Sequence, residues 1–290
     1  MRYFVLILIS SINLYSQEMV EKDSLWTTRG NVAVLLNQTG FSDWVGGGTN
    51  NFSGTLKFDY EWEFKDKGWD WLTNVESAFG LAKYKNAPFA RKIDDRILIQ
   101  SIVGKEFTKN LSFSAFFNFT SQIGNGFKYK KDSENNEIRE LTTRIFSPAY
   151  FQLGSGFLWK KDESLWVNYS PVAARLILVS KKFTSSLPEN ETYFGVTQNK
   201  SSRYELGSNL TFHSEGTLFE NVNYKQDLKL FSNYLENPSN IDLDYLAQIE
   251  IDVNPLLSTQ LIFQLIYDDN AIARLQVREV FGVGVQLKLN

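Results

Sequence analysis

The chain has 290 residues, and its 30 Lys and Arg nearly balance its 33 Asp and Glu, so the net charge is −3 and no basic face for nucleic acid is expected. It contains no Cys and a single His, which excludes disulfides, thiolate metal sites and Cys nucleophiles and leaves no ligand set for a His-based metal site. Aromatic residues make up 15% of the chain and charged residues 22%, a composition that is amphipathic rather than disordered.

The N-terminus has the layout of a secretory signal peptide. Arg2 precedes a short apolar run, and the small residue Ser16 permits cleavage before Gln17. The apolar run is too short to cross a bilayer as a helix, and no later segment has the roughly 20 apolar residues that a transmembrane helix needs. The alternative is a buried N-terminal strand. We expect three regions: a signal peptide over 1–16, a periplasmic segment over 17–28 and one exported domain over 29–290.

Beyond the N-terminus, apolar and polar residues alternate with a period of two, which predicts β-strands. In the clearest window, 241–253, one face carries mainly Ile, Leu, Tyr and Val and the other mainly Asp, Glu and Gln. Such a strand cannot face protein core on both sides. The segments with this pattern lie near 29–38, 51–65, 70–84, 93–107, 110–122, 148–160, 164–180, 202–213, 217–234, 239–253, 256–269 and 275–290.

The strand lengths and the connections predict a transmembrane β-barrel. Segments of roughly ten residues or more suit tilted membrane-spanning strands, and bacterial barrels have even strand numbers, with short periplasmic turns and longer outer loops. The short turns are expected near 65–68, 108–110, 160–164, 214–216 and 254–255, and the loops at 39–50, 85–92, 123–147, 181–201, 235–238 and 270–274. We expect an all-β fold, a single transmembrane antiparallel barrel of about twelve strands. The alternative is a secreted two-layer β-sandwich.

Aromatic residues fit the two interfacial belts of such a barrel. Those beside the predicted turns are Trp62, Trp69, Trp71, Trp159 and Trp166, and those at the opposite strand ends are Tyr150, Tyr234 and Tyr267. An open sheet edge in hydrocarbon would leave backbone groups unpaired, so the sheet is expected to close on itself.

Several stretches of the sequence resemble one family of barrel proteins. They are 38–50, 91–95, 147–151, 169–171, 203–207, 266–269 and, most tellingly, 231–242 with the sequence FSNYLENPSNID. Over these residues the chain resembles the Bacteroidota outer-membrane barrels grouped as a domain of unknown function, DUF3078. The resemblance implies a Gram-negative outer-membrane location and carries over no catalytic residue.

The polar face of each strand is expected to line the lumen. The acidic candidates on these faces are Asp59, Glu61, Glu63, Glu76, Glu205, Asp227, Asp242, Asp244, Glu250 and Asp252, and the basic candidates are Lys57, Arg96, Arg203, Lys225, Lys229, Arg278 and Lys288. One interpretation is a lattice of cross-strand ion pairs that fills the barrel, and the other is a charged pathway for small cations. Twelve strands lie between filled barrels of about eight and open channels of 16–18, so strand number does not decide pore size. The loops 123–147 and 181–201 are long enough to fold inward as a plug.

The first outer loop is a candidate contact surface. Its apolar anchors and its glycines are Phe41, Trp44, Gly46, Gly47 and Gly48. The glycine run lacks a following Lys-Ser/Thr and a following helix, so it is not a phosphate loop. It is expected to let the loop fold back tightly, and the alternative is a ligand platform.

Two further groups of polar residues have both a functional and a plain interpretation. His213 and Ser214 are reminiscent of the His–Ser pair of barrel phospholipases, but neighbours on a strand face opposite sides, so a solvated turn His is expected. Asp268, Asp269 and Asn270 offer oxygen ligands for Ca²⁺, but three residues cannot complete its shell, so a charged turn is expected.

The sequence therefore predicts a barrel without catalytic activity and without a cofactor. We expect a structural or accessory component of the cell envelope that contacts outer-membrane lipid, works with another envelope protein and binds no nucleic acid. The alternative is a passive channel for small, cationic solutes. A lipid-active membrane enzyme is the third hypothesis, to which only His213 points.

Overall fold

The computed structural model describes residues 25–40, 49–271 and 273–289. The predicted signal peptide, its cleavage site between Ser16 and Gln17, and most of the predicted periplasmic segment lie outside the described residues. The same holds for the candidate contact residues of the first loop, which are Phe41, Trp44, Gly46, Gly47 and Gly48.

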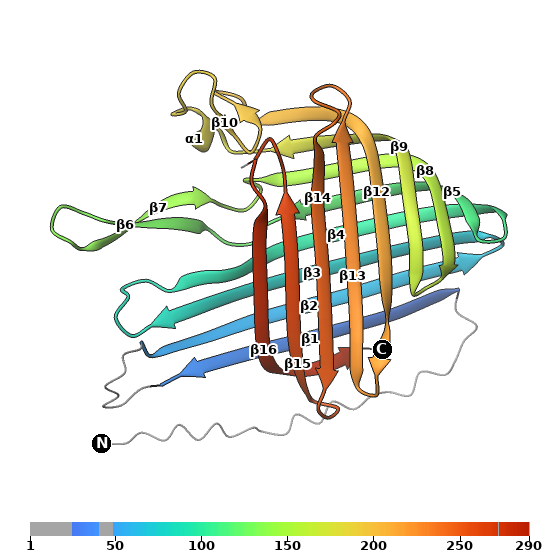
Figure 1. Ribbon diagram of the computed structural model, residues 1–290, viewed down its shortest axis with the longest axis horizontal. Helices are drawn as coiled ribbons and strands as arrows, with labels where there is room; N and C mark the ends of the chain where they lie inside the picture. The colour runs from blue at the N-terminus through green and yellow to red at the C-terminus, as the bar shows by residue number, and fades with distance from the viewer. Residues whose placement is uncertain (1–24, 41–48, 272, 290) are drawn as a thin grey trace.

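Within the described residues, twelve strands form a closed antiparallel barrel, which confirms the fold class predicted from the sequence. Their order around the ring is β1-β16-β15-β14-β13-β12-β9-β8-β5-β4-β3-β2 (Figure 1). The barrel strands are β1 (Trp26–Thr39), β2 (Asn51–Asp66), β3 (Trp69–Tyr84), β4 (Arg91–Thr108), β5 (Leu111–Ser121), β8 (Ala149–Asp162), β9 (Leu165–Leu178), β12 (Ser202–Phe219), β13 (Val222–Asn233), β14 (Ile241–Asp252), β15 (Leu257–Tyr267) and β16 (Gln276–Leu289).

The barrel wall is polar inside and apolar outside, the reverse of a soluble core. On β16 the side chains of Val285 and Leu287 are 51% and 45% exposed, whereas Gln286 between them is fully buried. On β9 and β12 the buried positions include Asn168 and Asn209. Because successive strand residues point to opposite faces, the alternation seen in the sequence becomes an apolar surface for lipid and a polar lining.

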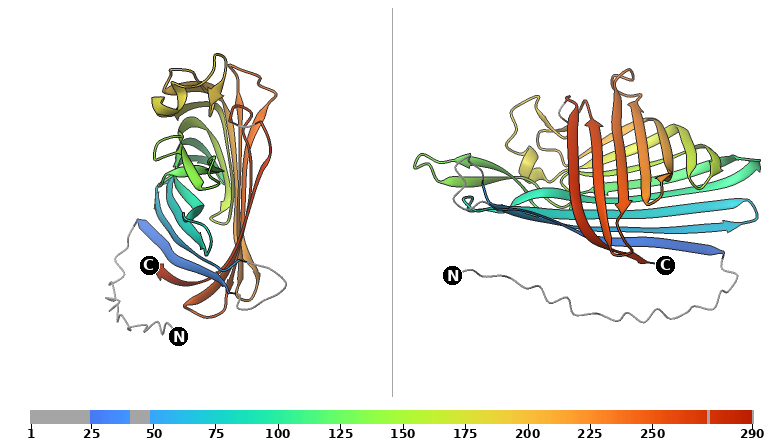
Figure 2. Two further views of the ribbon diagram at one scale, coloured as in Figure 1. Left: turned by 90° about the vertical axis from the view of Figure 1, so that its left-hand side faces the viewer. Right: turned by 60° about the horizontal axis from the view of Figure 1, so that its bottom comes forward.

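The barrel is flattened rather than round. Figure 1 shows β13, β14, β15 and β16 crossing in front of β1, β2, β3 and β4 at a steep angle, and the left view of Figure 2 shows how narrow the barrel is in the other direction. Side chains from the two walls therefore meet across the lumen, which is what makes the candidate site below.

The two ends of the barrel differ, and we call them the turn end and the loop end. The turn end carries the tight connections between the barrel strands, which are 67–68, 109–110, 163–164, 220–221 and 253–256. The predicted turn at 214–216 is wrong, because β12 continues to Phe219 and the chain reverses at 220–221. Asn221 there adopts a positive φ of 64°, a conformation that Asn tolerates well.

At the loop end, the segment 123–147 forms a hairpin of β6 (Gly126–Lys131) and β7 (Glu137–Thr143) that projects away from the barrel (Figures 1 and 2). It does not plug the lumen, because it extends away from the loop end (Figure 1), and its strands pair only with each other. Arg139 at its surface stacks on the rings of Phe89 and Phe127, at 4.8 and 4.5 Å from the ring centres. The hairpin is therefore fixed to the loop that contains Phe89 instead of entering the barrel.

The segment 181–201 lies over the loop end. It contains the short helix α1 (Lys181–Thr184) and a two-stranded sheet of β10 (Thr192–Tyr193) and β11 (Val196–Thr197). Gly195 in this segment lies close to Arg203 on β12 and to Asn270 in the loop after β15. A Cβ added at Gly195 would lie 3.2 Å from the side chain of each. The segment therefore packs against both of these elements. No helix in the described part of the chain has the length and hydrophobicity to cross a membrane.

The aromatic belts form only in part. Trp69, Trp71 and Trp159 are 40–48% exposed on the outer surface near the turn end, as expected for an interfacial belt. Trp166 instead points inward, is 8% exposed and stacks on His213 with 5.1 Å between ring centres. Tyr150 likewise packs against a buried apolar cluster rather than facing lipid.

Candidate functional site

The middle of the lumen is crossed by an ion pair between opposite walls. In the ring, β13 and β3 stand six places apart and so face each other directly. The ammonium of Lys225 on β13 lies 3.0 Å from Glu76 Oε1 on β3 and 3.9 Å from Asp59 Oδ2 on β2. Arg96 on β4 approaches the other oxygen of Glu76 at 2.8 Å. The predicted candidates Lys225 and Asp59 are thus brought together by contacts that can exist only inside the barrel.

A second set of contacts joins β16 and β2 to the walls that face them. Arg278 on β16 pairs with Asp94 on β4. Lys57 on β2 donates to Gln260 Oε1 at 2.8 Å on β15 and to Gln248 Oε1 at 3.4 Å on β14. None of these pairs joins neighbouring strands, so each one bridges the lumen.

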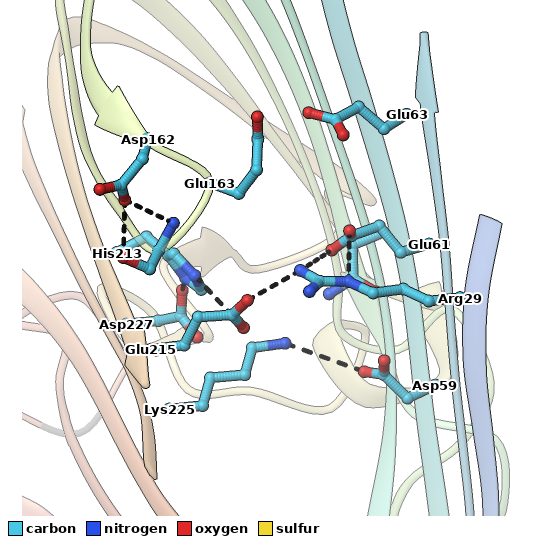
Figure 3. A network of polar contacts seen from close by, with 12 residues as sticks. Arg29, Asp59, Glu61, Glu63, Asp162, Glu163, His213, Glu215, Lys225 and Asp227 are labelled. Carbon is cyan, nitrogen blue, oxygen red and sulfur yellow. Dashed lines mark hydrogen bonds and ion pairs between the residues drawn. The ribbon is translucent and has the colours of Figure 1, made fainter. Parts of the chain in front are cut away.

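A polar chain runs from β13 to β2 near the turn end (Figure 3). Asp227 Oδ1 lies 2.8 Å from His213 Nδ1, and His213 Nε2 lies 3.6 Å from Glu215. Glu215 then pairs at 2.9 Å with Arg29 on β1, and Arg29 pairs at 2.7 Å with Glu61 on β2. The predicted candidate Glu61 is therefore one end of a chain that crosses the lumen.

His213 is not the solvated turn residue that the sequence suggested. It lies inside β12, is 6% exposed, and has carboxylates and the Trp166 ring as its described partners. Ser214 is on the opposite face of the strand and its hydroxyl lies 3.1 Å from that of Tyr224. The His–Ser pair of a hydrolase is therefore not assembled by these two residues.

Lys160 on β8 occupies the centre of three carboxylates at the turn end. Its ammonium lies 3.1 Å from Glu63, 2.5 Å from Asp70 and 2.5 Å from Glu163, and Lys65 also pairs with Glu63 at 2.9 Å. One oxygen from each of the three acids lies within 4.8 Å of the others, which would suit a cation with oxygen ligands. The lysine supplies that positive charge within the protein itself.

The loop end is crossed by an arginine network. Arg175 on β9 pairs with Glu205 on β12 and, at 2.5 Å, with Asp242 on β14. Arg203 also pairs with Glu205 at 2.8 Å and reaches Glu236 at 2.9 Å. Asp242, a predicted candidate, is thus bound to a residue on a strand three places away in the ring.

The remaining predicted lumen charges make more local contacts. Asp244 accepts from Gln264 at 2.9 Å, and Glu250 accepts from Gln260 at 3.1 Å. Asp252 accepts from Gln286 at 2.7 Å and pairs with Lys288 at 3.2 Å. Lys229 lines an enclosed cavity of about 20 Å³ together with Asp244 and Arg96.

Sequence reasoning missed several residues that complete these contacts, and five of them are central to the networks. They are Arg29, Asp70, Asp94, Lys160 and Arg175. Asp70 lies an even number of residues from Glu76 on β3, and Asp94 lies two residues from Arg96 on β4. Each therefore faces the lumen like its neighbour, and the alternation in the sequence could have identified both. Lys160 lies at one register shift between β8 and β9, and Arg175 follows another, so counting every second residue along the chain gives the wrong face for them.

Two larger hollows lie toward the turn end. A vestibule of about 560 Å³ opens there, lined among others by Lys57, Asp59 and Glu250, and a second hollow of about 520 Å³ surrounds Lys160. Further inside, the cavities shrink to about 40 and 20 Å³, which is room for single water molecules.

The Asp268 loop is a hydrogen-bonded turn at the loop end. Asp268 Oδ1 accepts from the backbone N–H groups of Asn270 and Ala271, both at 3.0 Å, and Asp269 accepts from Asn240 at 2.9 Å. Burial is the main reason why the pKa of Asp268 is raised above its ordinary value, and the nearby Asp242 raises it further. These contacts form the turn expected from the sequence, but Asp268 is buried in it rather than solvated.

The fold and its lining define a class of protein: a closed β-barrel with an apolar outer surface and a charged lumen is an outer-membrane β-barrel. Within this class, the family model described as "Protein of unknown function (DUF3078)" matches residues 36–127, in agreement with the resemblance found in the sequence.

Comparisons of the chain with curated proteins and with solved structures found the following. No curated protein matches it in sequence. Similar solved structures include the translocator domain of the autotransporter NalP from Neisseria meningitidis, with 9% identity, a TM-score of 0.43 and coverage of 91% of this chain and 88% of that one. An outer membrane channel from Pseudomonas putida F1 has 10% identity, a TM-score of 0.37 and coverage of 93% and 99%. The β domain of a Bordetella autotransporter has 8% identity, a TM-score of 0.35 and coverage of 91% and 99%.

Proposed function

We propose that this protein is a non-catalytic outer-membrane barrel with a filled lumen, a structural or accessory component of the envelope that works with a partner protein. The observation that carries this proposal is the contact of Lys225 with Glu76, because it joins strands that stand opposite each other in the ring. In this role the turn end faces the periplasm and the loop end faces outward.

Ion pairs cross the lumen at three levels. Lys160 with Glu63 crosses it near the turn end, Lys225 with Glu76 crosses the middle, and Arg278 with Asp94 crosses toward the loop end. Opening a pathway would separate buried charges from their partners, and breaking one such pair by losing a partner is strongly unfavourable. The interior therefore acts as a rigid filling, and the surfaces left for function are the outer wall, the loops and the turns.

The described residues also support a non-catalytic role. The acids and the His of the lumen bind one another and the basic groups, and His213 has two carboxylates at its ring nitrogens rather than a nucleophile. A hydrolytic site needs a nucleophile held by the base. A His213→Ala variant is expected to leave lipid turnover unchanged, and loss of a lipolytic activity in that variant would contradict this part of the proposal.

Planar-bilayer recording tests the filled lumen. The purified full-length barrel is expected to give no steady openings. A variant with Ala at both partners of all three crossings (Lys160 and Glu63, Lys225 and Glu76, Arg278 and Asp94), checked for folding by its heat-modifiable mobility on gels, is expected to conduct because every crossing is removed. Steady openings of the unmodified protein would overturn the proposal.

A passive channel for small cations is the second candidate, and the charged vestibule of about 560 Å³ at the turn end favours it. This function predicts cation-selective openings of the unmodified protein that vanish in an Asp244→Asn/Glu250→Gln variant. The accessory role predicts instead that a second envelope protein co-purifies in detergent at a fixed ratio, and its absence would contradict that role.

A further inference from the structure

The seam between the first and last strands is closed over only half its length. β1 and β16 pair from Gly30 opposite Leu289 to Leu36 opposite Val283. Beyond that point the two strands diverge toward the loop end, as Figures 1 and 2 both show. By comparison, β1 pairs with β2 along its whole length, from Trp26 to Thr39.

The divergence leaves one edge of β16 unpaired among the described residues. This open edge comprises 276–282, and the same residues are paired with β15 on their other side. A strand edge presents alternating N–H and C=O groups, and lipid tails cannot satisfy them. The neighbouring outward residues on β15, Leu261 and Phe263, form part of the apolar surface, so the open edge lies beside lipid.

A single carboxylate lies at the centre of the open edge. Glu279 is exposed on the outward face of β16, between Val277 and Phe281, which are 58% and 64% exposed. It stands opposite Phe263 in the ladder, and no hydrogen bond or ion pair joins it to any described residue. A charge in such surroundings is unfavourable unless an opposite charge meets it, so the edge carries both a hydrogen-bonding pattern and a charge to be matched.

A second copy of the chain fits this edge poorly. Two copies that pair symmetrically through 276–282 place Glu279 against Glu279 of the other copy, because that residue is at the centre of the segment. Like charges directly opposite on paired strands are destabilising. A different partner with a basic residue at that position avoids the repulsion and neutralises the carboxylate.

We infer that the open edge of β16 is the docking site of the partner protein, an inference that rests on the accessory role proposed above. An extended segment of the partner adds to the edge as a further strand, satisfies its backbone groups and places a Lys or Arg beside Glu279. Strand addition of this kind obtains affinity from main-chain hydrogen bonds and specificity from side chains.

Site-specific photo-crosslinking in the intact envelope of cells that make this protein tests the inference. A photoreactive residue replaces Val277 in the open half of the seam, and the matched control replaces Val285, which is equally outward but lies in the paired half. We expect one protein adduct from position 277 and none from position 285. Sequencing of the adduct is expected to show an extended segment of a different protein that contains Lys or Arg.

Charge variants in the same experiment separate docking from mere proximity. Glu279→Lys is expected to lower the adduct about tenfold or more, because a charge pair becomes a repulsion, whereas Glu279→Asp is expected to retain it. Heat-modifiable mobility verifies that each variant is folded. An adduct with a second copy, lipid adducts alone from both positions, or an adduct unchanged by Glu279→Lys would each overturn the inference.

A third crosslinking position distinguishes this inference from the proposed function. Ile138 on β7 is 47% exposed on the projecting hairpin. A protein adduct from Ile138 without one from Val277 would place the partner elsewhere, which overturns the seam as docking site and leaves the accessory role standing. If no protein co-purifies and no position gives a protein adduct, the accessory role itself fails.

Discussion

Lys225 on β13 and Glu76 on β3 meet at 3.0 Å across the full width of the barrel. Removing Lys225 leaves the buried carboxylate of Glu76 with Arg96 as its remaining ion-pair partner, so Lys225→Met is expected to lower the free energy of unfolding by about 3 kcal/mol, the lower end for breaking a buried pair. Denaturant titration in detergent micelles measures the change.

The same pair provides its own control. Lys225→Met combined with Glu76→Gln removes both charges while the amide can still accept from Arg96, so most of the lost stability is expected to return. Lys130→Met breaks an ion pair with Glu140 whose side chains are half exposed or more, and is expected to change stability by less than about 0.5 kcal/mol. Equal losses in the free energy of unfolding from Lys225→Met and Lys130→Met would contradict the stabilising role of the pair inside the lumen.

The three carboxylates around Lys160 lead to a prediction about metal binding. Lys160→Met leaves Glu63, Asp70 and Glu163 close together without the ammonium, and we expect a loss of about 1–2 kcal/mol from their repulsion. Calcium is expected to restore stability in this variant, by about 1.4 kcal/mol at ten times its Kd. Thermal unfolding with and without calcium measures the effect.

The unmodified protein is expected to show no calcium-dependent shift at this place, because Lys160 already occupies the centre of the acids. Lys161→Met changes the exposed neighbour and is the matched control. A calcium response equal in Lys160→Met and Lys161→Met would show that the three acids do not act together.

The strands were predictable because a membrane barrel must alternate lipid-facing and lumen-facing residues at nearly every position. The window 241–253 shows this, since the observed β14 matches it within two residues. The turn wrongly predicted at 214–216 has the same cause, the alternation of lipid-facing and lumen-facing residues. His213 and Glu215 are polar because they face the lumen, and Glu215 pairs with Arg29 on the opposite wall, yet in sequence such residues resemble a turn.

The pairing of the lumen charges could not be predicted in the same way. Strand parity places Asp59 and Lys225 inside the barrel, but which charge meets which depends on how far the barrel is flattened and how the strands are staggered. Arg175 was missed because a register shift between β8 and β9 precedes it. The half-open seam at β16 was also invisible, since every strand looks alike in an alternating sequence.

Close backbone contact at Gly207 leads to a stability prediction. A Cβ added there would lie 1.8 Å from the carbonyl oxygen of Ser232, and backbone cannot yield as a side chain can. Gly207→Ala is therefore expected to destabilise the barrel by about 3 kcal/mol. The matched control is Gly54→Ala, whose added Cβ meets the end of the Leu36 side chain at 3.3 Å and the Leu35 carbonyl oxygen at an ordinary 3.9 Å, and which gains the usual advantage of Ala over Gly. Equal unfolding midpoints for the two variants would contradict this contact.

The buried turn at Asp268 makes the loop end sensitive to pH. Its pKa is raised above the ordinary value of 3.8, chiefly by burial, so the folded loop favours the neutral acid. The folded loop then binds more protons than the unfolded loop. The stability of the loop is therefore highest below the ordinary pKa of Asp268 and falls as pH rises through the raised pKa.

Asp268→Asn is neutral at every pH and can still accept from the N–H groups of Asn270 and Ala271. Hydrogen-exchange protection of these two amides between about pH 4 and pH 8 is expected to fall in the unmodified protein and to stay high in the variant. Asp132→Asn in the projecting hairpin is the control and is expected to leave both profiles unchanged, whereas protection that rises with pH in the unmodified protein would show that Asp268 is stabilised as the carboxylate.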